Sequence, residues 1–385
     1  MVVVPLRYNL RSLLRRRLAL FMTVVGVAAV VAIFVAMMAI ANGLRGALSD
    51  SGDARNVIVT RRGTLVETMS VVDHESFAIL RDLPEVARDA QGRPLASPEV
   101  VTVWSVSDVD GKDRQIPMRG VTDVAYGVRQ IEITAGRKPE AGKGEAMVGS
   151  ALAGRIQGLS LGGRFRWGRR EWRVVGVFEA RGSAFESEVW GDVDGVLADD
   201  DRAQFSSVAM RATSASSVPS LAARIDGDRR FSLHAQRETD YYRVQAGSAA
   251  PARAAALTMA LLMGIAAVFG ALNTMQASLA GRSREIAVLR ALGFGRLAIG
   301  LGFVVEALML TIPAGALGCA LAMSIHGHSM SMTNIFSFTS VAFRFRVTPD
   351  VIASGMLFAV AIGVLGGAWP AFVATRGSLT DGLRS

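Results

Sequence analysis

Four long apolar runs constrain this chain more than any other feature of its sequence. They cover residues 18–41, 254–279, 297–325 and 351–373. The first run has no charged residue over about 24 positions, roughly 36 Å of helix, which is enough to cross about 30 Å of hydrocarbon. Only 19% of all residues are charged, fewer than a soluble enzyme of this length carries. The runs therefore predict an integral membrane protein with four transmembrane helices.

The N-terminal segment, residues 1–17, has the pattern of an amphipathic helix on a membrane surface. Leu6, Leu10 and Leu13 share one helical face, and arginines occupy the other sides. A cleaved signal peptide is the alternative, but its apolar core spans about 7–15 residues, fewer than residues 18–41 provide. We therefore expect the first run to remain as a transmembrane helix.

A domain rich in β-strands is predicted for residues 42–253, where charges, glycines and turn residues interrupt short apolar pieces. We expect it to have its own core and to divide into two lobes. Strands are predicted at residues 56–60, 100–106, 115–119, 128–133, 165–167, 171–178 and 207–211, with a hairpin turn at 168–170. Helices are predicted at 73–80, capped by Asp73, at 150–157, and at 218–225 with Pro219 in the first turn.

The distribution of arginines predicts the orientation. Residues 1–17, the segment 280–296 and the tail 374–385 all carry arginines, and four spans place these three on one side. That side is the cytoplasm by the positive-inside rule. The fold class is therefore an α+β membrane protein of four transmembrane helices, with a large strand-rich extracytoplasmic domain between spans 1 and 2. The loop 326–350 also faces outward.

The stretch Gly281–Gly293, GRSREIAVLRALG, lies between the second and third apolar runs. Apolar residues recur in it at helical spacing, with charged residues around them. Arginine costs about 2.5–3.5 kcal/mol at a bilayer centre, so the stretch lies at a membrane surface. The pattern alone leaves two interpretations open, a loop that anchors topology and a short helix that docks on a partner.

The identities of these residues resemble a known family. The sequence Asn273-Thr274-Met275, then Arg284-Glu285-Ile286, then Leu289-Arg290-Ala291-Leu292-Gly293, then Glu306, is similar to the core motif of MacB/FtsX-type permeases of ABC transporters, the type VII or mechanotransmission class. Residues 136–182 resemble the periplasmic core domain of that family. The end of the chain, with Trp369-Pro370-Ala371, Asp381 and Leu383-Arg384, also resembles it, except that Leu379 replaces a usual proline.

This resemblance implies a function for the stretch 280–296. In the family it is the cytoplasmic coupling helix that contacts the ATPase, and the matching positions are Arg284, Glu285, Ile286, Leu289, Arg290, Leu292 and Gly293. The resemblance also implies two copies of a separate ATPase subunit, which hold the ATP and Mg²⁺, a second permease subunit as homo- or heterodimer, and a periplasmic adaptor or lipoprotein as a further partner. The chain itself is then no enzyme and binds no cofactor.

The expected function is that of an inner-membrane permease subunit that transmits ATP-driven motion to the extracytoplasmic domain, for export or for extraction of lipoproteins or lipids. The competing hypothesis is a non-transport receptor or scaffold, whose outer domain senses a ligand or regulates a cell-wall hydrolase. It predicts no ATPase partner. The net charge of +9 does not indicate nucleic-acid binding, because many arginines flank the apolar runs.

Other candidate sites are weaker. Gly136 to Gly144 approaches a P-loop, but the spacing is one residue too long and Gly144 replaces the Ser or Thr that binds Mg²⁺. His326 and His328 have no third metal ligand nearby in sequence. The single cysteine, Cys319, excludes an intramolecular disulfide.

Polar and small residues inside the apolar runs are expected to hold helices together. Asn273 and Thr274 are positioned to hydrogen-bond between helices, and Gly363 and Gly367 form a GxxxG spacing typical of close helix packing. Glu306 is the one acid well inside a run, where acids are expensive. A structural ion pair or polar helix contact is favoured for it over transport of an ion.

Overall fold

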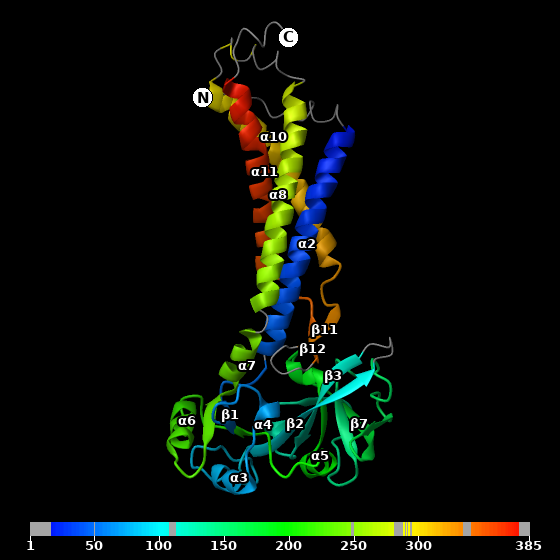
Figure 1. Ribbon diagram of the computed structural model, residues 1–385, viewed down its shortest axis with the longest axis vertical. Helices are drawn as coiled ribbons and strands as arrows, with labels where there is room; N and C mark the ends of the chain where they lie inside the picture. The colour runs from blue at the N-terminus through cyan, green and yellow to red at the C-terminus, as the bar shows by residue number, and fades with distance from the viewer. Residues whose placement is uncertain are drawn as a thin grey trace. The chain divides into compact units, whose positions relative to one another are not determined.

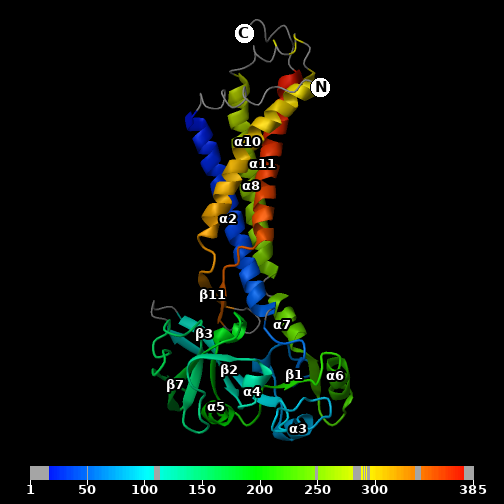
Figure 2. The ribbon, with the colours of Figure 1, turned by 180° about the vertical axis from the view of Figure 1, so that it is seen from behind.

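The computed structural model describes residues 17–49, 51–107, 113–247, 250–280, 288, 290, 292, 295–333 and 340–376. The chain divides into two compact units. The helical bundle comprises residues 1–42, 251–328 and 345–385, and the sheet domain comprises residues 43–250 and 329–344. Figures 1 and 2 show the elements of both units from opposite sides.

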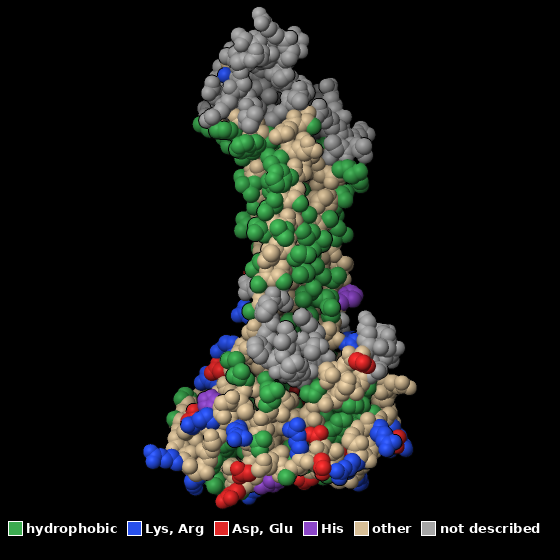
Figure 3. All heavy atoms as spheres, in the orientation of Figure 1, with side chains coloured by type: hydrophobic (Ala, Val, Ile, Leu, Met, Phe, Trp, Pro, Cys, Tyr) green, Lys and Arg blue, Asp and Glu red, His purple; other side chains and the backbone are tan. Residues whose placement is uncertain are grey.

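The long helices of the bundle correspond to the four apolar runs. They are α2 (Arg17–Ser49), α8 (Ala250–Ala280), α10 (Arg296–Met323) and α11 (Pro349–Arg376). Within the described residues, each of these four contains a stretch long and apolar enough to cross a membrane. Large apolar side chains such as Phe21, Leu261 and Phe269 remain exposed along them (Figure 3). Outward-facing apolar side chains on long helices are what an apolar solvent requires.

Helix α2 does not end at Ala41, where the sequence predicts the end of the first span. It continues unbroken to Ser49, and its last turns, from Gly43, belong to the sheet domain. Gly43 does not terminate the helix. A side chain at Gly43 would lie 2.3 Å from the carbonyl oxygen of Arg344, the last residue of strand β12 (Ser340–Arg344). The glycine therefore allows this strand to approach the helix closely.

One continuous sheet organises the sheet domain. In the described chain its strands run in the order β10-β1-β9-β2-β3-β8-β5-β7-β4, with β6 paired to β7. The order has many crossovers, since neighbours in space come from distant parts of the sequence. The strands are β1 (Asn56–Arg61), β2 (Ala96–Ser107), β3 (Asp113–Val121), β4 (Glu132–Gly136), β5 (Glu145–Gly149), β6 (Arg164–Trp167), β7 (Arg170–Glu179), β8 (Val189–Asp192), β9 (Ser207–Arg211) and β10 (Leu233–Arg237).

The long strand β2 joins two halves of this sheet. Its first part, Ala96–Glu99, pairs with β9, and from Val100 onward it pairs with β3. Glu99 is therefore the last residue before the strand changes partner. The two halves of the sheet join at this point into one compact unit, and the division into two lobes stays a prediction.

Short helices cover the sheet: α3 (His74–Leu80), α4 (Ala125–Val128), α5 (Val193–Asp199), α6 (Val218–Gly227) and α7 (Glu238–Ala246), with 3-10 turns η2 (Glu67–Met69) and η3 (Ala184–Ser187). Two of them begin as the sequence predicts. The Asp73 carboxylate caps α3 by accepting a hydrogen bond of 2.7 Å from the Ser76 amide, and a proline lies in the first turn of α6. In both figures α6 lies beside β1.

Two local predictions are wrong. The strand predicted at residues 128–133 begins only at Glu132, as β4: Val128 ends α4, and Gln130 adopts a left-handed φ of 52° between the two elements. Residues 150–157 form turns instead of a helix. After one turn, Gly154 has a φ of 73°, which a right-handed helix does not accommodate.

The predicted loop 326–350 contains a β-hairpin made by β11 (Ser329–Thr333) and β12 (Ser340–Arg344). This hairpin belongs to the sheet domain although the helices on either side of it belong to the bundle. The hydroxyl of Ser187, in η3, accepts a hydrogen bond of 2.8 Å from the Ala342 amide. No strand was predicted for this loop from the sequence.

Candidate functional site

The two faces of the sheet are buried in different ways. One face carries an apolar core that includes Val57, Met118 and Val148. Alternate residues point to the opposite face, where α7 and η3 supply Tyr241, Tyr242 and Phe185. Charged side chains lie among these aromatic residues. We call them the ionic cluster; its members are Glu67, Glu99, Arg119, Arg129, Glu188 and Glu238, all at most 8% exposed.

Arg119, on β3, is the centre of the cluster. Its guanidinium binds Glu188 through two nitrogens, with Nε 2.7 Å from Oε2 and Nη2 2.9 Å from Oε1. Nη1 lies 2.6 Å from Glu99 Oε2 and 3.0 Å from Glu67 Oε1. The planar guanidinium supplies five N–H donors in a rigid arrangement, which suits three surrounding carboxylates.

Arg129 follows α4 and extends the cluster. Its Nε and Nη2 lie 3.1 Å and 2.8 Å from the two oxygens of Glu99, and its Nη1 lies 2.5 Å from Glu238 Oε1. The guanidinium carbon stands 4.5 Å from the centre of the Phe185 ring. An aromatic face so close excludes water and attracts the cation.

Four carboxylates face two guanidiniums, so each arginine has a strong electrostatic reason to stay charged. Burial alone would lower the pKa of Arg119, but attraction to Glu188, Glu67 and Glu99 raises that pKa well above its ordinary value. Burial alone would raise the pKa of Glu67, but Arg119 and Arg129 outweigh it and hold that pKa below its ordinary value. Glu67 is therefore ionised at neutral pH.

The chain enters and leaves the main part of the sheet domain at this cluster. Residues 51–56, the incoming segment, follow α2, and Glu238 begins α7, which leads to α8. The Asp53 amide and the Asn56 side-chain amide both donate to Glu238 Oε2, at 3.1 Å and 2.8 Å. The incoming and outgoing parts of the chain thus meet at one carboxylate.

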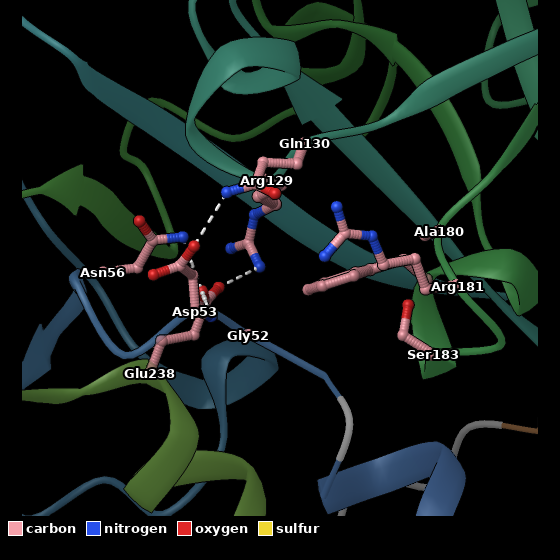
Figure 4. A pocket seen from close by; sticks show the side chains of 10 residues that line it. Gly52, Asp53, Asn56, Arg129, Gln130, Ala180, Arg181, Ser183 and Glu238 are labelled. Carbon is pink, nitrogen blue, oxygen red and sulfur yellow. Dashed lines mark hydrogen bonds and ion pairs between the residues drawn. The ribbon is translucent and has the colours of Figure 1, made fainter.

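A small pocket of about 70 Å³ opens beside this contact. Figure 4 shows Asp53, Asn56 and Glu238 on the side of Arg129, with Arg181 and Ser183 opposite. Gln130 closes one edge by donating to Asp53 Oδ2 at 2.8 Å. Among the residues that the structure describes, no group of three His, Cys, Asp or Glu side chains is arranged to hold a metal ion. His326 instead accepts a hydrogen bond from the Val347 amide at its Nδ1, 3.1 Å away.

The predicted packing residues of the bundle lie at helix contacts. A side chain added at Gly363 would come 2.2 Å from the hydroxyl of Thr311, and one at Gly367 would come 2.9 Å from the side chain of Ala307. Both glycines of α11 thus face α10 directly. Close approach through small residues is typical of membrane helix pairs.

The predicted polar residues of the spans differ in their surroundings. The Thr274 hydroxyl, on α8, lies 2.8 Å from the Thr23 hydroxyl on α2. Asn273, its neighbour, is exposed, whereas Glu306 on α10 is only 1% exposed. The bundle therefore places one predicted residue in a hydrogen bond between helices and buries another among apolar helices.

Most of the predicted coupling residues cannot be placed. Arg284, Glu285, Ile286, Leu289 and Gly293 fall outside the described residues. Leu292, which is described, is 71% exposed, and Arg290 is half-buried in a helical conformation. Their proposed contact with an ATPase stays a prediction.

The ionic cluster was not predicted from the sequence, although a signal exists. Within β2 and β3, Glu99 and Arg119 stand at positions whose neighbours two residues on, Val101 and Val121, are buried. The pattern to search for is a charged residue at an inward-facing position of one strand, together with a residue of opposite charge at an inward-facing position of another strand.

A four-span helical bundle with a sheet domain inserted between its first two spans defines a class of multi-pass membrane proteins. Comparison with known families identifies the particular one. The family model of the MacB-like periplasmic core domain matches residues 20–227, and that of the FtsX-like permease C-terminal region matches residues 257–379. The first alone covers more than half of the chain. The chain belongs to the MacB/FtsX family of ABC transporter permeases.

Individual relatives are more distant. The uncharacterized ABC transporter permease YvrN of Bacillus subtilis (strain 168) is 32% identical over 130 residues, a match that spans 32% of this chain and 30% of that protein. The extracellular domain of the ABC-type transporter YknZ from Gram-positive bacteria is similar at 16% identity and a TM-score of 0.37, covering 47% of this chain and all of that structure. The periplasmic region of MacB from Actinobacillus actinomycetemcomitans is similar at 12% identity and a TM-score of 0.37, covering 51% of this chain and 94% of that structure.

Proposed function

We propose that this permease passes the ATP-driven motion of a separate ATPase subunit across the membrane into its sheet domain. The observation that carries the proposal is the position of that domain, inserted between two membrane helices of which α2 continues into it without a break. A continuous helix transmits displacement along its axis, because its hydrogen bonds resist stretching and bending. Family membership supports an ATPase as the source of that displacement.

The receiving site of this motion is the segment 280–296. Its apolar residues Ile286, Leu289 and Leu292 enter a groove of the ATPase, and Arg284, Glu285 and Arg290 form the charged rim. ATP and Mg²⁺ are bound by the partner, two ATPase copies serve two permease subunits, and this chain itself catalyses no reaction.

The bundle spans the cytoplasmic membrane with both chain ends and residues 280–296 in the cytoplasm. Arginines flanking the spans support this orientation. The sheet domain then acts outside the cytoplasm, together with a periplasmic adaptor or lipoprotein. Its size favours export of a compound, or extraction of a lipoprotein or lipid, over control of a cell-wall hydrolase.

Charge reversal in the coupling segment tests this function. Glu285→Arg and Leu289→Asp are each expected to weaken co-purification of the ATPase from native membranes, or to abolish the effect of the permease on ATP turnover. Glu132→Arg is the matched control, since Glu132 is exposed on β4 in the sheet domain. If both coupling variants behave as this control does, the segment only anchors topology and a receptor or scaffold becomes the better explanation.

Orientation has its own test. In a Cys319→Ala background, a cysteine at Ser160, which is exposed, is expected to react with a membrane-impermeant maleimide added from outside the cytoplasm. Reaction only from the cytoplasmic side would reverse the topology and contradict the proposed direction of work.

A further inference from the structure

We propose that Glu238 clamps the incoming and outgoing segments of the sheet domain into one unit and connects that unit to both halves of the sheet. The inference rests on the proposed function, because it assigns residues to the transmission step. It makes Glu238 a positioning residue: it contacts no substrate and works by holding two chain segments and Arg129 together. Its oxygens divide this task between them.

Oxygen Oε2 of Glu238 holds the incoming segment. It accepts from the amide of Asp53 and from the side chain of Asn56, at 3.1 Å and 2.8 Å. Gly52, just before, has a φ of 92°, and a side chain there would come 2.7 Å from Glu238 Cγ. The backbone is thus shaped to lie directly against this glutamate. These contacts join the segment that follows α2 to the first residue of α7.

Oxygen Oε1 of Glu238 connects the two segments to the sheet. It accepts from Arg129, which in turn binds both oxygens of Glu99. Glu99 lies where β2 changes partner from β9 to β3, and it also binds Arg119 of β3. Charges alternate along the whole path, from Glu238 through Arg129 and Glu99 to Arg119. The path therefore begins at the incoming and outgoing segments and ends at the point where β2 changes partner from β9 to β3.

Stability alone is a poor explanation for such a path. Buried ion pairs are often no more stabilising than apolar groups of the same volume, because removing charges from water is expensive. What they supply is geometry, since a carboxylate and a guanidinium accept few relative positions. The side chain of Arg129 is buried and its guanidinium lies against the ring of Phe185. This arrangement is expected of a segment whose side chains must keep their relative positions while the protein changes conformation.

Hydrogen exchange on the full-length protein in nanodiscs tests the clamp itself. Glu238→Gln keeps the shape of the side chain but removes its charge. We expect exchange to accelerate together in residues 51–56 and 238–246, by about two to three and a half orders of magnitude, the size that follows from breaking one partner of a buried pair. Asp240→Asn is the matched control, since Asp240 is half-exposed on the same helix and pairs with the exposed Arg243. Acceleration in one segment alone, or equally over the whole sheet, would overturn the clamp.

A second variant separates transmission from stability. Arg129→Met with Glu238→Leu removes one charge of each sign, and Glu99 keeps Arg119 as its partner. Because Glu99 still loses its bonds to Arg129, the thermal midpoint of this variant is measured first, and all exchange is compared well below it. In the assembled complex we compare exchange of β2 with and without ATP. The wild type is expected to show an ATP-dependent difference in β2, and the double variant is expected to lose it while still binding the ATPase.

The outcomes of this comparison are distinct. An ATP-dependent difference that persists unchanged in the double variant refutes the clamp and leaves the proposed function standing. The absence of any difference in the wild type refutes the proposed function instead. If the double variant does not fold, the exchange pattern of Glu238→Gln still decides whether the two segments move as one.

Discussion

The interior of the bundle and the interior of the sheet domain are stabilised by opposite kinds of contact. In the bundle, backbones touch: Gly363 and Gly367 let α11 approach α10 so closely that no side chain fits between them. In the sheet domain, long charged side chains reach across the interior, and Arg119 alone binds three carboxylates. The difference follows from the solvent. Lipid offers helices no gain from burying apolar surface, so close contact decides, whereas water around the sheet domain drives a core that can tolerate paired charges.

Removing Arg119 is expected to have the largest effect, and only on the sheet domain. Arg119→Met leaves three carboxylates facing one another without their shared cation, and breaking such a buried group costs about 3–5 kcal/mol. Thermal unfolding followed by tryptophan fluorescence in a Trp369→Phe background reports on this domain, since the other four tryptophans lie in it. Arg166→Met, at an exposed position of β6, is the control. Equal midpoints for the two variants would show that the cluster does not hold the domain.

Acid attacks the same cluster through Glu67. Because its pKa in the folded protein lies below the value of about 4.3 for an unfolded chain, its ionisation stabilises the fold. This contribution is fully present above about pH 4.3 and is lost as the pH falls through the lower folded pKa. We expect the thermal unfolding midpoint of the sheet domain to decrease as the pH falls through that window. Glu67→Gln is expected to make the midpoint less dependent on pH. A Glu67→Gln protein with the wild-type slope would assign the acid sensitivity to other carboxylates.

A larger side chain at Gly363 is expected to disrupt the close packing of the bundle. Gly363→Val forces α10 and α11 apart, and overpacking of this kind costs about 1–3 kcal/mol. The matched control is Gly270→Val in α8, which has open space where its side chain would lie. Loss of helical circular dichroism on titration with a denaturing detergent measures the bundle. We expect an earlier midpoint for Gly363→Val only; the same shift in both variants would point to helix propensity as the cause.

The smallest effect is expected from the hydrogen bond between Thr23 and Thr274. Hydrogen bonds between membrane helices are worth about 0.6 kcal/mol on average, so Thr274→Val should shift the same detergent midpoint slightly. Thr258→Val removes only a bond to the carbonyl of Ala254 in its own helix and serves as control. A shift as large as that of Gly363→Val would mean that polar contacts, and not close packing, hold the bundle.

The sequence predicts the bundle better than the sheet domain, for a physical reason. A membrane span depends on the sum of many apolar residues, so runs such as 297–325 survive local irregularities. A strand depends on partners that are distant in sequence. Val189–Asp192 forms β8 because neighbouring strands accept it, and its four residues have no local pattern that would indicate a strand. The left-handed conformation of Gln130 is likewise invisible to propensity.

The same limit applies to the site. Motif identities indicate which stretch we propose as the contact with the ATPase, since those residues are close in sequence. The members of the ionic cluster come from six separate parts of the chain, from Glu67 to Glu238, and only the folded sheet brings them together. A search for charges at inward strand positions finds Glu99 and Arg119. It does not find Glu238, because Glu238 stands at the first residue of a helix, where an acid is ordinary.

The unbroken course of α2 limits how a chain of this kind can change in length. Its 33 residues form one helix, about 50 Å long. One residue inserted anywhere along it would rotate everything that follows by about 100° and advance it by about 1.5 Å. Seven inserted residues would leave a rotation of only about 20°. Relatives that keep this helix continuous are therefore expected to differ in its length by whole pairs of turns, and single-residue insertions there should be selected against as errors of rotational phase.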